Sequence, residues 1–320
     1  SNEAESLLLL QEIGRLYEVE IGDASHAFDW YGKAVQKAPA RADLRSHFEE
    51  LAELAGTQAK LVATYKEVVQ GSVALDDNTV HAIWRTIARV SQRELGDAGQ
   101  AVAYWERLLE ALPDDGEVLA ALELLYREIG RFEALLGILE RRESLSTQEK
   151  EKIGFSFKRA AILVEHIGRL DEAAKSYITV LDVDPDNLEA IRGLKAIYVR
   201  KEDWAALAEN LQRELALSPD GRDAVLLELG DVYLQRVGDV ETALEHYSQL
   251  LDGPESEAAL GRLESLLDRA ALRHRIARLV EPSLRRLESW ARLADMLEIR
   301  MEELADPLDR ASLLWELFEL

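Results

Sequence analysis

The sequence contains no cysteine among its 320 residues. This absence excludes disulfide bonds, thiolate nucleophiles and the cysteine-based types of zinc and iron–sulfur site, but it leaves the redox compartment open. Long apolar runs are also absent, since no stretch approaches the roughly 20 residues that a membrane span needs. The apolar run at 7–10 is too short for the core of a signal peptide and has no basic residues before it. We therefore expect a soluble chain without membrane insertion.

Basic residues are few relative to acidic residues. Lys and Arg number 38 against 61 Asp and Glu, which gives a formal net charge of -23. Such a surface repels the phosphate backbone of nucleic acids and anionic membranes, so we predict no nucleic-acid partner. The composition is 48% hydrophobic and 31% charged, with only 7 prolines, which is typical of an ordered and mostly helical protein.

The start of the chain says little about localisation. It begins with Ser1-Asn2 and has no initiator methionine, which is typical of a cleavage scar on an excised fragment. A targeting signal would have been removed together with a native start, so the compartment stays unknown, with a cytoplasmic location favoured.

The strongest internal signal is a glycine pattern that occurs four times, at Gly22, Gly96, Gly168 and Gly238. The same offsets from each glycine carry the same residue types: a small residue eight before (Gly14, Ala88, Ala160, Gly230), alanine five after (Ala27, Ala101, Ala173, Ala243), an aromatic nine after (Tyr31, Trp105, Tyr177, Tyr247) and proline near seventeen after (Pro39, Pro113, Pro185, Pro254). Apolar positions three to five residues apart form one helical stripe, and proline then ends the helix. Each glycine is therefore predicted to lie in the turn of an antiparallel helix pair.

A second kind of turn is predicted 34 residues after each of the first three glycines, at Gly56, Gly130 and Glu202. Leucine follows each of these three turns by five residues, where the first kind of unit has alanine. A fourth copy fits at Glu288, which lies 50 residues after Gly238 instead of 34. The two kinds of unit therefore alternate as tandem pairs.

Together these features resemble the tetratricopeptide repeat, whose pattern is visible in Leu229-Gly230, Tyr233, Gly238, Ala243 and Tyr247. The resemblance covers nearly the whole chain. It implies an all-α fold, a right-handed α-solenoid (superhelix) of antiparallel helix hairpins, with a concave groove lined mainly by the first helix of each pair. The repeats are degenerate, because units of the first kind carry one extra residue before the turn. HEAT-like helix pairs are the alternative fold.

The repeat pattern divides the chain into three segments. Residues 1–255 are predicted to form the regular TPR-like solenoid, and 256–308 to continue it with one pair that contains a helical expansion. Within the expansion, Pro282 is expected to kink a helix or to mark a break near Glu281. The basic segment 262–292 holds eight arginines against four acidic residues. Residues 309–320 resemble the first helix of a truncated further repeat, so we expect the parent protein to continue beyond Leu320.

No residue pattern points to catalysis. None of the six histidines has the i, i+4 spacing of a zinc-binding helix. Adjacent carboxylates such as Glu49-Glu50 are most simply solvated helix faces in so acidic a chain, and no glycine-rich phosphate loop occurs. We therefore predict no enzymatic activity, no cofactor and no metal site.

The resemblance also places a set of arginines at or near the groove. The candidate binding residues are Arg85, Arg89, Arg93, Arg127, Arg192, Arg200, Arg285 and Arg286, and Arg15 and Arg278 project to the same surface. Arginine binds carboxylate with two parallel hydrogen bonds, so this set predicts an acidic peptide as ligand. The alternative is that the arginines only pair with glutamates four residues away on the same helix.

We accordingly predict a non-catalytic scaffold that binds a segment of a partner protein in its groove, and the arginines indicate that this segment is acidic. The alternative is an architectural spacer or self-assembly arm of a larger multidomain protein, with self-association through exposed repeat ends.

Overall fold

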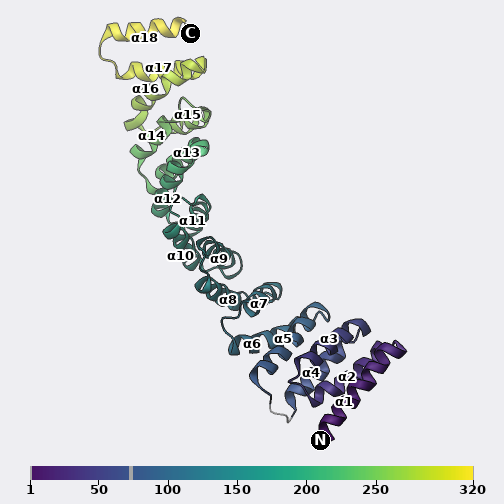
Figure 1. Cartoon of the computed structure of the whole chain (residues 1–320). Helices are drawn as coiled ribbons and strands as arrows, with labels where there is room; N and C mark the ends of the chain where they lie inside the picture. Colours follow the sequence, from purple (N-terminus) through teal and green to yellow (C-terminus); the bar gives the residue numbers. More distant parts are fainter. Residues whose placement is uncertain (1, 72–74, 320) are drawn as a thin grey trace. The chain divides into compact units, whose positions relative to one another are not determined.

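The computed structural model describes residues 2–71 and 75–319. Over these ranges the chain forms eighteen α-helices joined by short turns, and none of these residues is assigned to a strand (Figure 1). The all-α prediction is therefore confirmed. The chain divides into two compact units, Ser1–Phe155 and Ser156–Leu320, whose boundary falls inside helix α9 (Glu149–Ile162). Ser1 and Leu320, which bound the predicted segments, lie outside the described residues.

In the first unit each helix from α1 to α8 packs against the next one along the chain. The helices are α1 (Asn2–Arg15), α2 (Ala24–Lys37), α3 (Ala42–Ala55), α4 (Gln58–Gln70), α5 (Asp77–Arg93), α6 (Ala98–Ala111), α7 (Gly116–Glu128) and α8 (Phe132–Leu145), with a π-helical segment, η1 (Leu16–Ile21), after α1.

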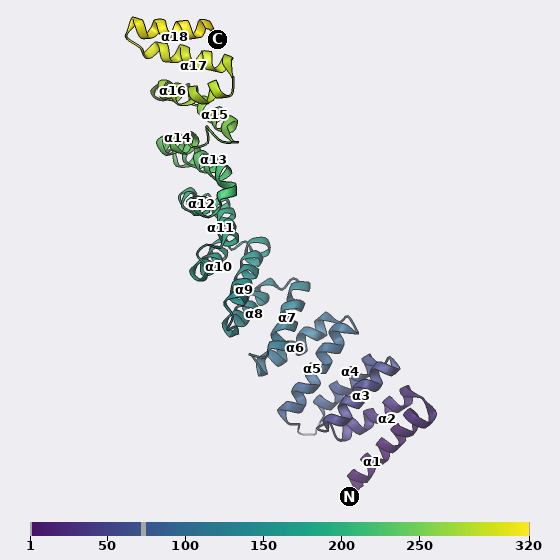
Figure 2. The ribbon, with the colours of Figure 1, turned by 45° about the horizontal axis from the view of Figure 1, so that its top comes forward.

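In the second unit the same packing continues from α10 to α18 (Figure 2). The helices are α10 (Leu170–Val183), α11 (Leu188–Lys201), α12 (Trp204–Leu217), α13 (Arg222–Val232), α14 (Val240–Ser248), α15 (Ser256–Glu264), α16 (Ala270–Arg286), α17 (Trp290–Glu303) and α18 (Pro307–Glu319). Two π-helical segments, η2 (Leu163–Ile167) and η4 (Tyr233–Val237), and a short 3-10 turn, η3 (Pro219–Gly221), complete this unit.

Three of the four turns of the first kind, those at Gly22, Gly168 and Gly238, accommodate their extra residue as a π-helical turn. The N–H of Gly168 donates to the Leu163 carbonyl at 2.8 Å, and the N–H of Gly238 donates to the Tyr233 carbonyl at 2.8 Å, so each bond spans five residues instead of four. A π turn contains one residue more than an α turn. Both glycines then adopt a left-handed conformation, with φ of 81° and 83°. The π-helical turn thus accommodates the one extra residue of these units just before the glycine.

Turns of the second kind have a different hydrogen-bond pattern, the Schellman motif of helix ends. The N–H of Thr57 donates to the Ala52 carbonyl at 2.9 Å, and Ser289 donates to Leu284 in the same way at 2.9 Å. The left-handed position is glycine in two of these turns, but it is Glu202 (φ 55°) and Glu288 (φ 52°) in the other two. The fourth copy, predicted at Glu288 despite its irregular spacing, is therefore confirmed as a turn of this kind.

The small residues predicted eight positions before the first kind of turn let an aromatic ring approach the helix backbone. A Cβ atom on Gly14 would lie 2.6 Å from a ring carbon of Tyr31, and one on Gly230 would lie 2.4 Å from a ring carbon of Tyr247. Both rings are buried. Because such separations are far inside van der Waals contact, any side chain at these two glycines would displace the ring.

The predicted expansion consists of α15, which packs against both α14 and α16. Pro282 lies inside α16, and this helix continues past it to Arg286. The predicted break near Glu281 is therefore wrong: a proline in a helix interior removes one hydrogen bond, and the close packing of α16 against α17 supports the helix across that gap.

The last helix, α18, covers the residues predicted to begin a further repeat. Leu313 and Leu317 pack toward the core that includes α17. The opposite side is strongly exposed, at Leu314 (56%), Trp315 (64%) and Phe318 (81%). The division into segments 1–255, 256–308 and 309–320 stays a prediction.

Candidate functional site

A cleft of about 200 Å³ lies between α3 and α5 in the first unit. These two helices are the first helices of consecutive hairpins, the elements on which the resemblance places a ligand. The cleft is lined by Glu49, Ala52, Glu53, Gln58, Leu61, Thr86, Arg89, Val90, Arg93 and Glu94.

The two walls of the cleft carry opposite charges at the same helical positions. Glu49 and Glu53 lie seven and three residues before the turn residue of their hairpin, and Arg89 and Arg93 lie seven and three residues before the turn residue of theirs. Arg89, Arg93 and Glu53 are exposed, whereas Glu49 is half-buried. In the part of the chain that the structure describes, no ion pair joins the two walls. The cleft therefore has Glu49 and Glu53 on one wall and Arg89 and Arg93 on the other, where Glu94 adds a carboxylate beside Arg93.

Hydrogen bonds fix the acidic wall at its inner end. Tyr65 of α4 donates its hydroxyl to Oε1 of Glu49 at 2.8 Å, and Thr86 of α5 donates to the same oxygen at 3.1 Å. Burial, followed by the charge of Glu49 and this hydrogen bond, raises the pKa of Tyr65 above its ordinary value. Tyr65 consequently stays a neutral donor, and Glu49 is held in one orientation.

Of the other arginines predicted in the first unit, Arg85 and Arg127 have carboxylate partners, whereas Arg15 is exposed and has no ion pair with any described residue. Arg85 contacts Asp115 at 2.5 Å and Glu117 at 2.9 Å, both at the start of α7. Arg127 contacts Glu123 at 3.1 Å, four residues away on the same helix. Neither Arg89 nor Arg93 has an ion pair with any described residue. Of the arginines predicted here, these two are the ones that line the cleft without an ion pair to any described residue.

The arginines predicted in the second unit are also engaged. Arg192 contacts Glu214 at 2.9 Å, Arg285 contacts Glu281 at 2.5 Å, and Arg286 forms an ion pair with Asp252. Arg200 is exposed and donates to the Val164 carbonyl at 3.4 Å. Arg278, projected to the same surface, contacts Glu303 at 3.1 Å. Among the predicted arginines, Arg127 and Arg285 pair four residues away on one helix, and the other ion pairs join a helix to another helix, to its N-cap Asp115 or to Asp252 in the turn after α14.

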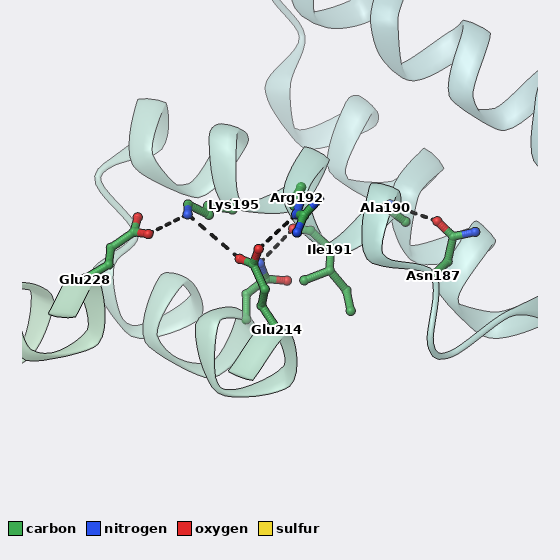
Figure 3. A network of polar contacts seen from close by, with 8 residues as sticks. Asn187, Ala190, Ile191, Arg192, Lys195, Glu214 and Glu228 are labelled. Atoms are coloured by element: carbon green, nitrogen blue, oxygen red, sulfur yellow. Dashed lines mark hydrogen bonds and ion pairs between the residues drawn. The ribbon is translucent and has the colours of Figure 1, made fainter. Parts of the chain in front are cut away.

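A polar network that surrounds Glu214 links α11, α12 and α13 (Figure 3). The Glu214 side chain is only 6% exposed, and it lies 2.9 Å from Arg192 and 3.8 Å from Lys195. Lys195 also contacts Glu228 of the next hairpin at 2.5 Å. Asn210, buried beside this network, donates to the Ile191 carbonyl at 2.8 Å. The buried carboxylate is thus compensated by two cations.

The same arrangement recurs in two other hairpins of the second kind. In each, the interacting residues stand seven positions before the turn residue and twelve after it. These pairs are Glu123 with Arg142, Glu281 with Arg300, and Lys195 with Glu214. In the third pair the charges are exchanged between the two helices. Our reading of the sequence missed these pairs, although the constant offsets were present in it, because it treated charged positions as surface.

The basic segment 262–292 is neutralised by neighbouring helices. Seven of its eight arginines form ion pairs with carboxylates, for example Arg262 with Asp231 at 2.8 Å and Arg292 with Glu264 at 2.8 Å. Arg273 contacts Glu302 at 3.4 Å. The local excess of positive charge therefore stabilises the packing of α13 to α18 and does not form a separate anionic-ligand surface.

Across residues 2–71 and 75–319, no three His, Asp or Glu side chains are grouped so that they could hold a metal ion. No helix in these ranges has both the length and the apolar character of a membrane span.

Comparisons with known proteins give weak similarities. No family model matches the sequence. The Homo sapiens protein O-mannosyl-transferase TMTC1 is 28% identical over 127 residues, which cover 40% of this chain and 14% of that protein. Among solved structures, a tetratricopeptide repeat protein from Parabacteroides merdae is 17% identical, with a TM-score of 0.35 over 88% of this chain and 99% of that one. YrrB, described as a TPR protein with an unusual peptide-binding site, is 19% identical, with a TM-score of 0.37 over 59% of this chain and 93% of that one.

The fold assignment rests on the chain's own geometry. Consecutive helices pack on one another, left-handed turn residues recur at the predicted positions, and in two first-kind hairpins an aromatic ring packs on the small residue where the pattern requires it, Tyr31 on Gly14 and Tyr247 on Gly230. The protein is therefore an α-solenoid built from TPR-like helix hairpins.

Proposed function

We propose that this protein is a non-catalytic interaction scaffold that binds a segment of a partner protein along the first helices of its hairpins, with Arg89 and Arg93 contacting carboxylates of that segment. The observation that carries the proposal is that these two side chains are exposed and form no ion pair with any described residue. Both line one cleft. Guanidinium groups of this kind bind carboxylate bidentately.

Rigid support for the cleft favours binding over a purely structural role. Helices α3 and α5 are fixed by buried residues such as Phe48, Leu51 and Ile87. A ligand that binds there requires little ordering of the scaffold, which lowers the entropic cost of association. The remaining candidate arginines, Arg85, Arg127, Arg192, Arg200, Arg285 and Arg286, contribute to this proposal only if a ligand displaces their present partners. The transferase name of the relative adds no activity here, because the chain covers 14% of that protein.

The test is partner capture from an extract of the source organism. The double variant Arg89→Glu/Arg93→Glu should lose a partner that the parent chain retains. Arg107→Glu is the control, because Arg107 is exposed on α6, the second helix of its hairpin, and does not line the cleft. Loss of the partner from both variants, or retention by both, would contradict a specific role for the cleft.

The alternative function, an architectural arm that self-associates through its ends, is favoured by one observation. Trp315 and Phe318 of α18 are 64% and 81% exposed, and exposed aromatic side chains of this size mark contact surfaces. Sedimentation of the parent and of Trp315→Ser/Phe318→Ser tests it. A concentration-dependent oligomer that the double variant abolishes, together with unchanged behaviour of Arg89→Glu/Arg93→Glu, would support the architectural function.

A further inference from the structure

We infer that the cleft between α3 and α5 recognises an extended peptide segment in which acidic and basic side chains alternate. This inference rests on the proposed function and specifies its ligand. The starting observation is that the cleft has two charged walls, with Glu49 and Glu53 on one side and Arg89 and Arg93 on the other. A purely acidic segment would satisfy the arginines but would be repelled by the glutamates.

The spacing within each wall fits an extended chain. The two charged residues of a wall are four positions apart on an α-helix, which corresponds to a rise of about 6 Å. Alternate residues of an extended strand are separated by about 6.6–6.8 Å and point to the same side, while the intervening residues point to the opposite side. A segment that lies along the cleft therefore directs two carboxylates to Arg89 and Arg93 and two ammonium groups to Glu49 and Glu53.

Glu49 and Glu53 are available to a ligand because hairpin α3–α4 lacks the basic side chains that pair with the equivalent glutamate of hairpin α7–α8. In α7–α8, Glu123 is paired with Arg127, four residues on, and with Arg142 on the second helix. The corresponding residues of α3–α4 are Glu53 and Val68. Glu49 therefore has no cation at either position, and its fixed oxygen accepts only the hydroxyl groups of Tyr65 and Thr86.

The inner surface of the cleft suits a peptide backbone. Ala52 and Val90 are small enough to leave room between the walls, and the side-chain amide of Gln58 is positioned at the cleft as a donor and acceptor for a main-chain group. The side open to solvent leaves the other main-chain groups hydrated, so an extended segment can bind there without burying unpaired polar atoms.

Direct binding to the full chain provides the test. Three fluorescently labelled peptides of about eight residues serve as probes: alternating Glu and Lys, an isomer with the same composition in which Glu and Lys form two blocks, and alternating Glu and Gly. Anisotropy titrations at low salt should show that the alternating Glu–Lys peptide binds about tenfold more tightly than either of the others. Arg89→Glu/Arg93→Glu and Glu53→Lys should each remove this preference, and Arg107→Glu should keep it.

The outcomes separate this inference from the proposed function. Equal binding of the alternating and block isomers overturns the inference, as does a preference that Glu53→Lys leaves unchanged. Tighter binding of the Glu–Gly peptide also overturns it, while an arginine-dependent acidic site would still stand. If none of the three peptides binds, the alternating ligand is refuted, and the capture experiment decides the proposed function by itself. Circular dichroism of each variant confirms that these exposed substitutions leave the fold intact.

Discussion

The buried carboxylate of Glu214 provides a sharp test of how these hairpins are held together. Replacing both of its cations, in Arg192→Met/Lys195→Met, leaves a charge that is only 6% exposed without compensation. An uncompensated buried charge typically costs about 3–5 kcal/mol of the free energy of unfolding. Each single replacement should cost much less, because the second cation remains and Arg192 itself is largely exposed. The two effects should therefore be strongly non-additive.

Urea denaturation followed by circular dichroism measures these differences. The control is the triple variant Arg192→Met/Lys195→Met/Glu214→Leu, which removes the charge together with its partners. Because apolar replacements of buried ion pairs are often neutral or stabilising, this variant should recover most of the lost stability. If the triple variant is as unstable as the double variant, the loss comes from packing and not from an uncompensated charge, and the reasoning fails.

Three further predictions concern turns, packing and pH. Gly230→Ala should destabilise the protein by about 1–3 kcal/mol because the new Cβ would clash with the buried ring of Tyr247. Gly137→Ala in helix α8, where a new Cβ meets no neighbouring atom, should instead stabilise the protein by about 0.5–1 kcal/mol. Thermal unfolding of the two variants measures the difference. Glu202→Gly should be neutral or slightly stabilising in urea denaturation, because the left-handed conformation costs a non-glycine residue about 1–2 kcal/mol. Burial lowers the pKa of His246 below its ordinary value of 6.5. The unfolded chain therefore binds a proton more readily than the folded chain, and the free energy of unfolding should fall as the pH drops through about 6.5. His246→Phe should flatten the dependence of the melting temperature on pH between about pH 7.5 and pH 5.5.

The turns and the interhelical contacts of small residues could be predicted from the sequence because they depend on local chemistry. A glycine that must adopt a left-handed conformation, or must lie beneath an aromatic ring, has few substitutes, so Gly22, Gly168 and Gly230 stand out at fixed offsets. Glu288 was identified by its neighbours Trp290 and Leu293 although it is not glycine. The continuity of α16 past Pro282 could not be read locally, because packing against α17 compensates for the missing hydrogen bond.

Whether each arginine forms an ion pair could not be predicted from the sequence, because pairing depends on which carboxylates the fold brings within reach. Arg85 and Arg89 lie one turn apart on α5 and are equivalent in sequence terms. The structure nevertheless places Arg85 at 2.5 Å from Asp115 at the start of α7, whereas Arg89 turns toward the cleft. A prediction of binding residues from a surface projection therefore includes ion-paired and unpaired arginines alike, and only interhelical distances separate them.

One further regularity connects the stability of the hairpins with the binding surface. The position seven residues before the turn is Arg15 in α1, Glu49 in α3, Arg89 in α5 and Glu123 in α7, so consecutive first helices of the first unit alternate in charge. Where a hairpin supplies its own cations, as α7–α8 does for Glu123, the position stabilises the fold. Where the hairpin supplies no opposite charge, as at Arg89, the side chain has no ion pair with any described residue. If the proposed function holds, the difference between structural and binding charges lies in the residues three before and twelve after the turn, and a change at those two positions would convert one role into the other.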